Sequence, residues 1–367
     1  MKKLLGIITA LFCVLTFSAT AFGLQATFTP RTSVTQQYTS NVFLDEDDEE
    51  DDWLTIGSVG FTLGLLGKNS GLDLSYDPSY AYYKEFDDNN SWRHSARLRS
   101  WAQPSKHTRF EISDDFLRSE DTLSRDEIDL IRSEDPLLEL DPTIRRGRNE
   151  FTRNVARGQF TYMFGAENDV YVGYINRLED NSEASEEDSM EHNPYIGFNY
   201  WFNPLNALEG RGDYTYGDYD ESDDYDDYEG MLRFRHRYNS QLSAFIQYNH
   251  TYRDFDGNSI DYMVYEPSVG MTYDLERDLS LLVRAGYFYQ DPDEGDNVSG
   301  FSGEASLTKL WPKASLEVVA EGGYDRTDST SENLGFEKYY QGSAFFNYQF
   351  TRRIGGNVSA LYRITQY

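Results

Sequence analysis

Cysteine is almost absent from this chain. Among 367 residues only Cys13 is a cysteine, and it lies in an apolar run near the N-terminus. Disulfide frameworks and structural zinc sites need several cysteines, or cysteines combined with histidines, at short spacings. The rest of the chain therefore holds no disulfide and no thiolate metal site.

Long apolar runs are also scarce. The only one covers residues 4–17, between Lys2-Lys3 and the small residues Ala19-Thr20-Ala21. It is shorter than the roughly 20 residues that a membrane-spanning helix requires. A basic start, an apolar core and a small-residue site are typical of a secretory signal peptide. We predict that residues 1–21 are a signal peptide and that residues 22–367 form one exported domain.

Basic residues are few. The chain has 33 Lys and Arg against 63 Asp and Glu, a formal net charge of −30. Nucleic-acid binding depends on cations that neutralise phosphates, so a nucleic-acid partner is not expected. High net charge can also indicate disorder, but disordered chains are poor in aromatic residues and this one has 29 Tyr and 23 Phe.

What the chain does contain is a repeated segment of alternating polarity, about ten to fourteen residues long. Very short connections between segments alternate with longer, acidic ones. Outer-membrane β-barrels have this order, because their periplasmic turns are short and their extracellular loops are long. The short connections are 67–70, 104–107, 165–168, 203–206, 239–241, 276–278, 311–313 and 351–353, and the long ones are 45–52, 85–90, 120–148, 179–191, 220–227, 256–261, 291–297 and 325–337.

Within a segment, one face is apolar or aromatic and the other is polar. After Leu279, for example, Leu281, Val283, Ala285, Tyr287 and Tyr289 alternate with Ser280, Arg284 and Gln290, while Leu282 and Phe288 do not fit. A soluble β-sandwich also alternates, but it has no reason to gather Tyr and Trp at strand ends, as membrane interfaces do. We predict an all-β, antiparallel, up-and-down transmembrane barrel of about 16–18 strands in the outer membrane of a Gram-negative cell.

The segment count from Thr27 onward is about seventeen. Bacterial barrels normally have an even number of strands. We therefore expect that a closing strand is missing from residues 22–367 and that about eighteen would complete the barrel.

Several strand and turn patterns resemble the outer-membrane β-barrel porins associated with exopolysaccharide and exosortase gene clusters. The likeness covers nearly all of the exported chain, and its motifs are strand and turn patterns rather than a catalytic signature. The residues that carry it are 33–38, 41–44, 153–154, 162–165, 173–174 and 200–204. The resemblance implies a part in polysaccharide biosynthesis or export, with outer-membrane lipid, lipopolysaccharide, exopolysaccharide and periplasmic export components as partners. It implies no catalytic residue.

Arginines gather on the face expected to line the lumen. Arg suits bidentate contacts with carboxylate or phosphate groups, so these side chains could contact a passing polymer. Alternatively, they pair with lumen carboxylates and only keep the interior wet. The candidate charge ladder is Arg93, Arg97, Arg99, Arg153, Arg157, Arg233, Arg235 and Arg284, with Arg363 a further single arginine, and the carboxylates that face them include Asp73, Asp115, Glu209, Asp213, Glu266 and Glu317.

Aromatic residues share the expected lumen face. Their rings could stack on sugar faces along a glycan path, or they could simply pack the interior near the rims. These candidate lumen aromatics are Trp101, Tyr195, Trp201, Phe245, Tyr339 and Phe345.

The long connections offer two further hypotheses. The one at 120–148 contains Ser124 and Glu127 at capping-box spacing, so it could form a short helix that narrows the pore or a surface excursion. The acidic runs 45–52 and 220–227 could attract Ca²⁺ or Mg²⁺ diffusely, because these ions prefer oxygen ligands. No defined cofactor site is expected.

Function is expected to be non-enzymatic. Five histidines are present, but none lies in a recognisable catalytic motif. The sequence therefore favours a porin-like barrel that takes part in exopolysaccharide export or biosynthesis. Two alternatives stay open: a non-conducting surface scaffold or adhesin, and a hydrolase assembled at the rim, in which His94 and His250 would be the residues to change.

Overall fold

The computed structural model describes residues 24–42, 50–120, 149–183, 186–276, 278–327, 335–351 and 354–366. The predicted signal peptide, most of the 120–148 and 45–52 connections, including the predicted short helix at 124–131, and part of 325–337 lie outside these residues. The strands are β1 (Gln25–Thr39), β2 (Asp52–Leu66), β3 (Ser70–Tyr83), β4 (Ser91–Ser105), β5 (Thr108–Ser119), β6 (Phe151–Met163), β7 (Asp169–Asn181), β8 (Ser189–Asn203), β9 (Asn206–Tyr219), β10 (Tyr225–Arg237), β11 (Leu242–Phe255), β12 (Tyr262–Glu276), β13 (Leu279–Pro292), β14 (Val298–Trp311), β15 (Ala314–Thr327), β16 (Gly335–Gln349) and β17 (Gly355–Gln366).

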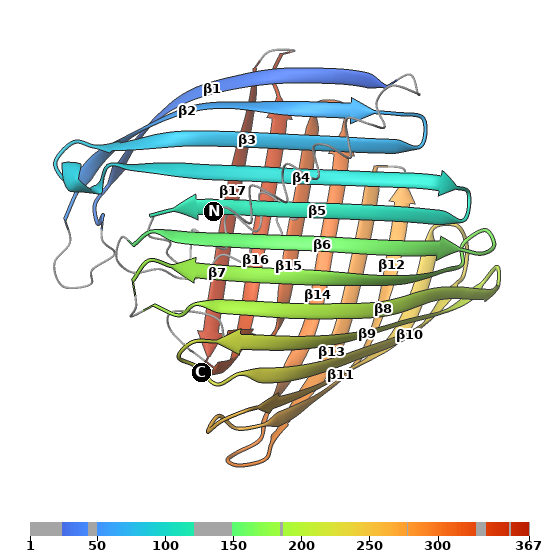
Figure 1. The fold of residues 1–367 in the computed structure, drawn as a ribbon. Helices are drawn as coiled ribbons and strands as arrows, with labels where there is room; N and C mark the ends of the chain where they lie inside the picture. Colours follow the sequence, from blue (N-terminus) through green and yellow to red (C-terminus); the bar gives the residue numbers. More distant parts are fainter. Residues whose placement is uncertain are drawn as a thin grey trace.

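These seventeen strands form one antiparallel sheet in sequence order. Each strand pairs with the next one along the chain, from β1 with β2 to β16 with β17. The sheet curls so that the strands from β2 to β8 form one wall and those from β12 to β17 form the opposite wall (Figure 1). One short 3-10 turn, η1 (Asp87–Asn89), lies between β3 and β4. The predicted fold class, an up-and-down antiparallel sheet of 16–18 strands, is confirmed.

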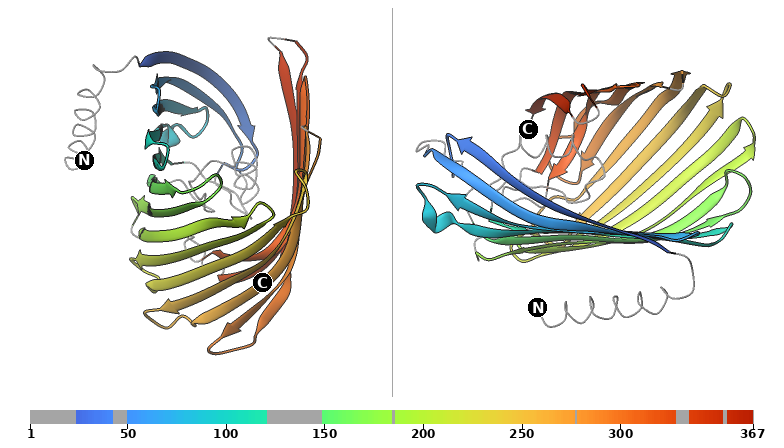
Figure 2. Two further views of the ribbon diagram at one scale, coloured as in Figure 1. Left: turned by 90° about the vertical axis from the view of Figure 1, so that its right-hand side faces the viewer. Right: turned by 90° about the horizontal axis from the view of Figure 1, so that it is seen from above.

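The sheet differs from a closed barrel at one place. Within the described residues β1 pairs only with β2, and β17 pairs only with β16. Both strands run in the same direction because the strand count is odd, so they cannot pair antiparallel with each other. Figure 2 shows β1 and β17 as the two free edges of the curled sheet. The expectation of an eighteenth, closing strand stays a prediction.

Alternation gives the sheet an apolar outer face. Large apolar side chains are widely exposed there, for example Phe301 at 73% and Val269 at 57%, whereas soluble proteins rarely expose apolar patches of this extent. An apolar outer band of this kind is what a barrel presents to lipid. Within the part of the chain that the structure describes, no helix is both long and apolar enough to cross a membrane.

Aromatic residues mark where the strands leave the apolar band. On β13 the outward residues after Ala285 are Tyr287, Tyr289 and then Asp291. On β9 the corresponding order is Tyr214, Tyr216 and Asp218. The Tyr214 ring packs at 5.1 Å from Tyr228 of β10, which lies 6.2 Å from Tyr252 of β11, so the aromatic residues form a row across these three strands. Amphipathic rings are favoured at this depth of a membrane.

Leu282 and Phe288, the two residues that break the alternating pattern of β13, have different surroundings. Phe288 is fully buried on the inner face, where it packs with Val264 and Tyr262 of β12. It therefore contributes to a small apolar cluster inside the sheet rather than to the lipid face. Leu282 lies on the same inner face, opposite Ser306 of β14.

Tight connections close the ends of the strands that lie opposite the long loops. In the connection 165–168, Gly165 has φ +99°, a conformation that side chains with a Cβ rarely adopt. Phe164 N–H donates to Asn168 C=O at 2.8 Å across this turn. The short connection predicted here is confirmed.

Acidic residues of the long connections hold these connections together. Three carboxylates each accept hydrogen bonds from two consecutive backbone N–H groups of the next long connection: Asp52 from Glu85 and Phe86, Glu187 from Glu221 and Ser222, and Asp223 from Asn258 and Ser259. Gly257 makes the last contact possible, since a Cβ there would lie 1.8 Å from Asp223 Oδ1. These acidic groups therefore have structural partners; ion binding at the rim stays a prediction.

The contact of Asp223 predicts a pH dependence. Hydrogen bonds from Ser259 and then Asn258 hold the pKa of the Asp223 carboxyl below its ordinary value. Because this pKa is lower in the folded state than in the unfolded state, the contact stabilises the folded protein at pH values above the unfolded-state pKa. That stabilisation is lost as the pH falls through the folded-state pKa. We expect the amides of Asn258 and Ser259 to stay protected from hydrogen exchange from pH 7 down to about pH 4, and to lose protection below it. Asp223→Ala should remove that protection at every pH, and protection unchanged in this variant would contradict the assignment.

Candidate functional site: a charged lumen

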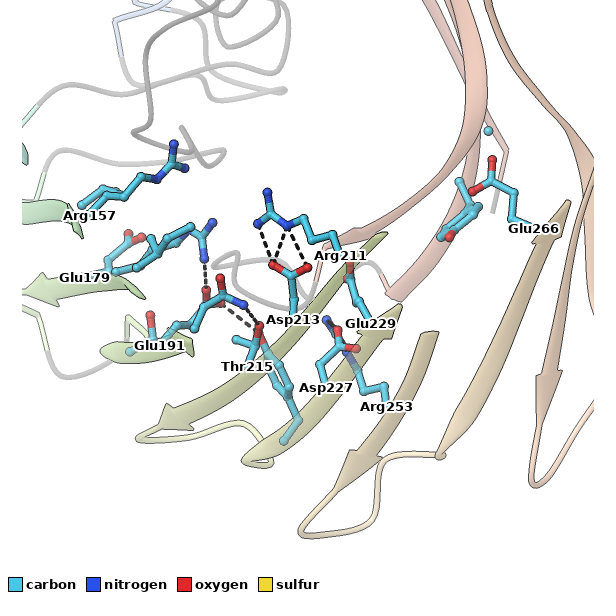
Figure 3. Close-up of a pocket in the computed structure, with 18 of the residues that line it drawn as sticks. Arg157, Glu179, Glu191, Arg211, Asp213, Thr215, Asp227, Glu229, Arg253 and Glu266 are labelled. Atoms are coloured by element: carbon cyan, nitrogen blue, oxygen red, sulfur yellow. Dashed lines mark hydrogen bonds and ion pairs between the residues drawn. The ribbon is translucent and has the colours of Figure 1, made fainter. Parts of the chain in front are cut away.

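The inner face of the curled sheet encloses a polar cavity of about 620 Å³. Most of its lining comes from β6 to β13, and Ser302, Gly322 and Tyr339 contribute from the strands beyond. A second cavity of about 270 Å³, lined by Arg99, Trp101 and neighbouring residues of β4 to β6, adjoins it. Arg157 lines both, and in Figure 3 its guanidinium points into the open space between the strands.

The predicted arginines lie on the inner face, and most of them pair with a carboxylate of a neighbouring strand. The pairs are Arg97 and Arg99 with Asp115, Arg153 with Glu179, Arg233 and Arg235 with Glu209, and Arg284 with Glu266, at N···O distances of 2.6–3.2 Å. Arg93 of β4 lies on the same face. The pairing partners come from adjacent strands rather than from across the lumen, because neighbouring strands bring side chains of the same face within reach.

Two of the predicted arginines belong to one continuous hydrogen-bonded chain. Arg233 donates to Gln247 at 2.7 Å, Gln247 donates to Asn249 at 2.9 Å, and Asn249 donates to Glu266 at 3.0 Å. Arg284 donates to the other oxygen of Glu266 at 3.0 Å. This chain joins β10 to β13 and fixes the positions of its side chains.

Most of the predicted lumen aromatics lie beneath an arginine. Five of them have a guanidinium carbon 4.0–5.6 Å from the ring centre: Trp101 beneath Arg109, Tyr195 beneath Arg211, Trp201 beneath Arg237, Phe245 beneath Arg233 and Tyr339 beneath Arg363. Phe345 is half-buried on β16. The rings therefore hold guanidinium groups in place, which leaves less ring area for a sugar than the sequence suggested.

Only part of the predicted set lines the two cavities. Arg153, Arg157, Arg284 and Tyr339 line the larger one, and Arg99, Trp101 and Arg157 line the smaller one. The remaining predicted residues, Arg93, Arg97, Arg233, Arg235, Tyr195, Trp201, Phe245 and Phe345, lie on the inner face of their strands outside these linings.

Three important arginines of the larger cavity were missed: Arg177, Arg211 and Arg253. Arg177 bonds to Glu191, Arg211 to Asp213 and Arg253 to Asp227. Each is a single cation on its strand, so none forms a row. One sequence pattern could have indicated Arg177 and Arg211. Each stands two residues before an acidic residue, in Arg177-Leu178-Glu179 and Arg211-Gly212-Asp213, and alternate residues of a strand share a face.

Arg237 links neighbouring parts of the sheet at the ends of the strands near the short turns. Arg237 stacks 4.0 Å from the centre of the Trp201 ring, and its Nη2 donates to Glu167 Oε2 at 2.9 Å. The hydrogen bond from Arg237 holds the pKa of the Glu167 carboxyl below its ordinary value. β10, β8 and the turn between β6 and β7 are thereby linked at this mouth.

The histidines of the enzyme alternative face outward. His94 shares a hydrogen bond of 2.8 Å with the Tyr76 hydroxyl, and the His250 ring lies 5.0 Å from the ring of Tyr265. His192 is hydrogen-bonded to Tyr174 in the same way. These rings belong to the aromatic row on the outer face, not to the lining of either cavity.

Comparison with solved structures identifies the fold. The FrpB iron transporter of Neisseria meningitidis superposes with a TM-score of 0.56 at 10% identity, over 92% of this chain and 61% of that one. The chain has the fold of an outer-membrane β-barrel. This likeness and the apolar outer face agree with the predicted location in the cell outer membrane.

A second similar structure spans the same length as this barrel. OccK8 (OprE) of Pseudomonas aeruginosa matches over 94% of both chains, with a TM-score of 0.45 and 12% identity. No family model and no curated protein matches the sequence. Since identity is so low, the likeness to FrpB establishes the fold alone, and the function has to be argued from the residues of this chain.

Proposed function

We propose that this barrel is a porin-like channel that takes part in exopolysaccharide export or biosynthesis. The observation that supports it most is the polar cavity of about 620 Å³ enclosed by strands whose outer face is apolar. A barrel needs an apolar exterior to reside in a membrane, but it has no need of a wet, charged interior of this size unless solute or water enters. The glycan part of the proposal comes from the sequence resemblance.

The partners follow from the same proposal. Outer-membrane lipid and lipopolysaccharide contact the apolar band and its aromatic row, while periplasmic export components would meet the mouth near Glu167 and Arg237. No residue acts as a catalyst in this function. The polar side chains keep a hydrated path through the membrane.

Single-channel recording tests the channel. The folded full chain, inserted in a planar bilayer, should give stable conductance steps that exopolysaccharide from the native host blocks. Deletion of the gene should reduce secreted polysaccharide and leave polysaccharide in the periplasm. A barrel shown to be folded that gives no steps would contradict the proposal and favour a surface scaffold.

A further inference from the structure

We propose that the wall formed by β4 to β13 binds carboxylate-bearing saccharides, although the chain as a whole carries a net charge of −30. This inference deepens the proposed function and rests on it, because the ligand is taken to enter the same lumen.

In these pairs the carboxylate is recessed and the guanidinium faces the water. The side chain of Asp115 is 2% exposed, whereas its partners Arg97 and Arg99 are 37% and 31% exposed. Asp213 is 15% exposed against 39% for Arg211. The same order holds for Arg177 with Glu191, Arg233 and Arg235 with Glu209, and Arg284 with Glu266. In each of these pairs a solute therefore meets the cation more than the anion.

Three other lumen pairs on the same strands do not have this orientation. In Arg153–Glu179 the cation is the more buried member, in Arg253–Asp227 both members are buried, and in Arg109–Glu111 both members are equally exposed. The exposed carboxylates Asp73 and Glu317 lie on β3 and β15, outside the wall. The cationic surface is thus local, and it does not reflect the charge of the whole chain.

The hydrogen-bonding groups of these pairs likewise offer a ligand more donors than acceptors. Glu191 accepts bonds from the hydroxyls of Tyr219 and Tyr225, both at 2.9 Å, and from Arg177. Asp213 accepts three bonds from Nε and Nη2 of Arg211. An ionised carboxylate offers about four acceptor sites, whereas a guanidinium has five N–H donors and no acceptor. Glu191 and Asp213 thus each accept three bonds, whereas Arg177 and Arg211 have more N–H groups than these bonds use, so the two pairs favour ligands that supply acceptors.

The donors are also held in position. Arg211 lies over Tyr195 at 4.5 Å, and Tyr195 in turn donates to Gln159 at 2.9 Å. In Figure 3 the guanidinium groups of Arg211 and Arg157 project into the same open space. A planar, fixed guanidinium suits the bidentate recognition of carboxylates. Several such groups along one wall suit a ligand with repeated carboxylates, that is, a chain of uronic acids.

Calorimetric binding tests this on the full-length barrel in a neutral detergent. An oligogalacturonate is compared with an uncharged maltooligosaccharide of equal length. The barrel should bind the acidic oligomer at least about tenfold more tightly, and high salt should weaken that binding because exposed charges are screened.

Paired variants locate the site. Arg177→Gln combined with Arg211→Gln should weaken oligogalacturonate binding by about fivefold or more, since each exposed charged contact contributes up to about a fivefold change. Arg118→Gln is the control for each of the two single changes: Arg118 lies near the end of β5 at the rim, is paired with Glu150, and its replacement removes one positive charge outside the lumen. Its binding should match the unmodified barrel.

The outcomes separate this inference from the proposed channel. Equal affinity for the two oligomers, or an equal loss in Arg118→Gln, would overturn the inference and leave conductance unaffected. Acidic-oligomer binding by a folded barrel that gives no conductance steps would support the inference as a binding property and contradict the channel. In a conducting barrel, the reversal potential across a KCl gradient should move towards that of K⁺ in the double variant.

Discussion

Arginine in place of Ala305 is expected to lower the free energy of unfolding by about 2–4 kcal/mol. Ala305 lies in the middle of β14 on the outer face, and its cross-strand partners are Val283 and Ala320. A cation at this depth would face hydrocarbon, which costs about that much at the middle of the bilayer. The measurement is denaturant-induced unfolding of the barrel from lipid vesicles, followed by tryptophan fluorescence.

The adjacent residue supplies the control. Ser306 lies on the inner face of the same strand, opposite Leu282, so an arginine there would reach the hydrated lumen. Ser306→Arg should change the free energy of unfolding by less than about 1 kcal/mol, as substitutions in a wet environment usually do. Equal losses in both variants would mean that the two faces have been assigned the wrong way round.

The fold was readable from the sequence because two signals are local. Alternating polarity is visible within one segment, and the order of short and long connections is visible from one segment to the next. Together they indicated the strand type, the count of about seventeen and the direction of each face. The arrangement of the two edge strands, β1 and β17, was less readable. Which edges pair depends on how the sheet curls, and no local pattern encodes whether β1 meets β17.

Part of the site was also readable. A row such as Arg97-Leu98-Arg99 is visible because alternate residues share a face. Its partner Asp115 depends on the register between β4 and β5, which the sequence does not give. The contact of Arg31 with Asp77 is harder still, because it crosses over β2 at Gly60, where a Cβ would lie 2.0 Å from Asp77 Oδ1.

The orientation of the ion pairs could not be predicted at all. Whether a carboxylate or a guanidinium faces the water depends on side-chain length and on which additional donors reach the acid. Glu191, for example, is held back by two tyrosine hydroxyls from β9 and β10. The formal charge of the chain thus says little about the charge that a solute meets inside.

Among the ion pairs of the described residues, the lumen pair Arg253–Asp227 is buried on both sides, and a single substitution there should destabilise the barrel most. Arg253 and Asp227 are 6% and 3% exposed, and Arg253 Nε donates to Asp227 Oδ2 at 3.1 Å. Arg253→Gln removes the cation while the carboxylate stays buried. We expect the free energy of unfolding to fall by about 3–5 kcal/mol, the usual cost of breaking such a pair from one side.

Replacing both partners distinguishes the cost of an isolated charge from the net value of the pair. Arg253→Met combined with Asp227→Leu removes both charges, and its free energy of unfolding should lie much closer to that of the unmodified barrel than Arg253→Gln does. Arg177→Gln, at a pair whose cation is water-exposed, should cost less than about 1 kcal/mol. If the double variant is as unstable as the single one, packing of the Arg253 side chain against Tyr225, 4.2 Å below its guanidinium, accounts for the loss instead of charge. The buried pair would then act as a packing element at the end of β10 and β11, whereas the exposed pairs would remain the part of the wall that a ligand can reach.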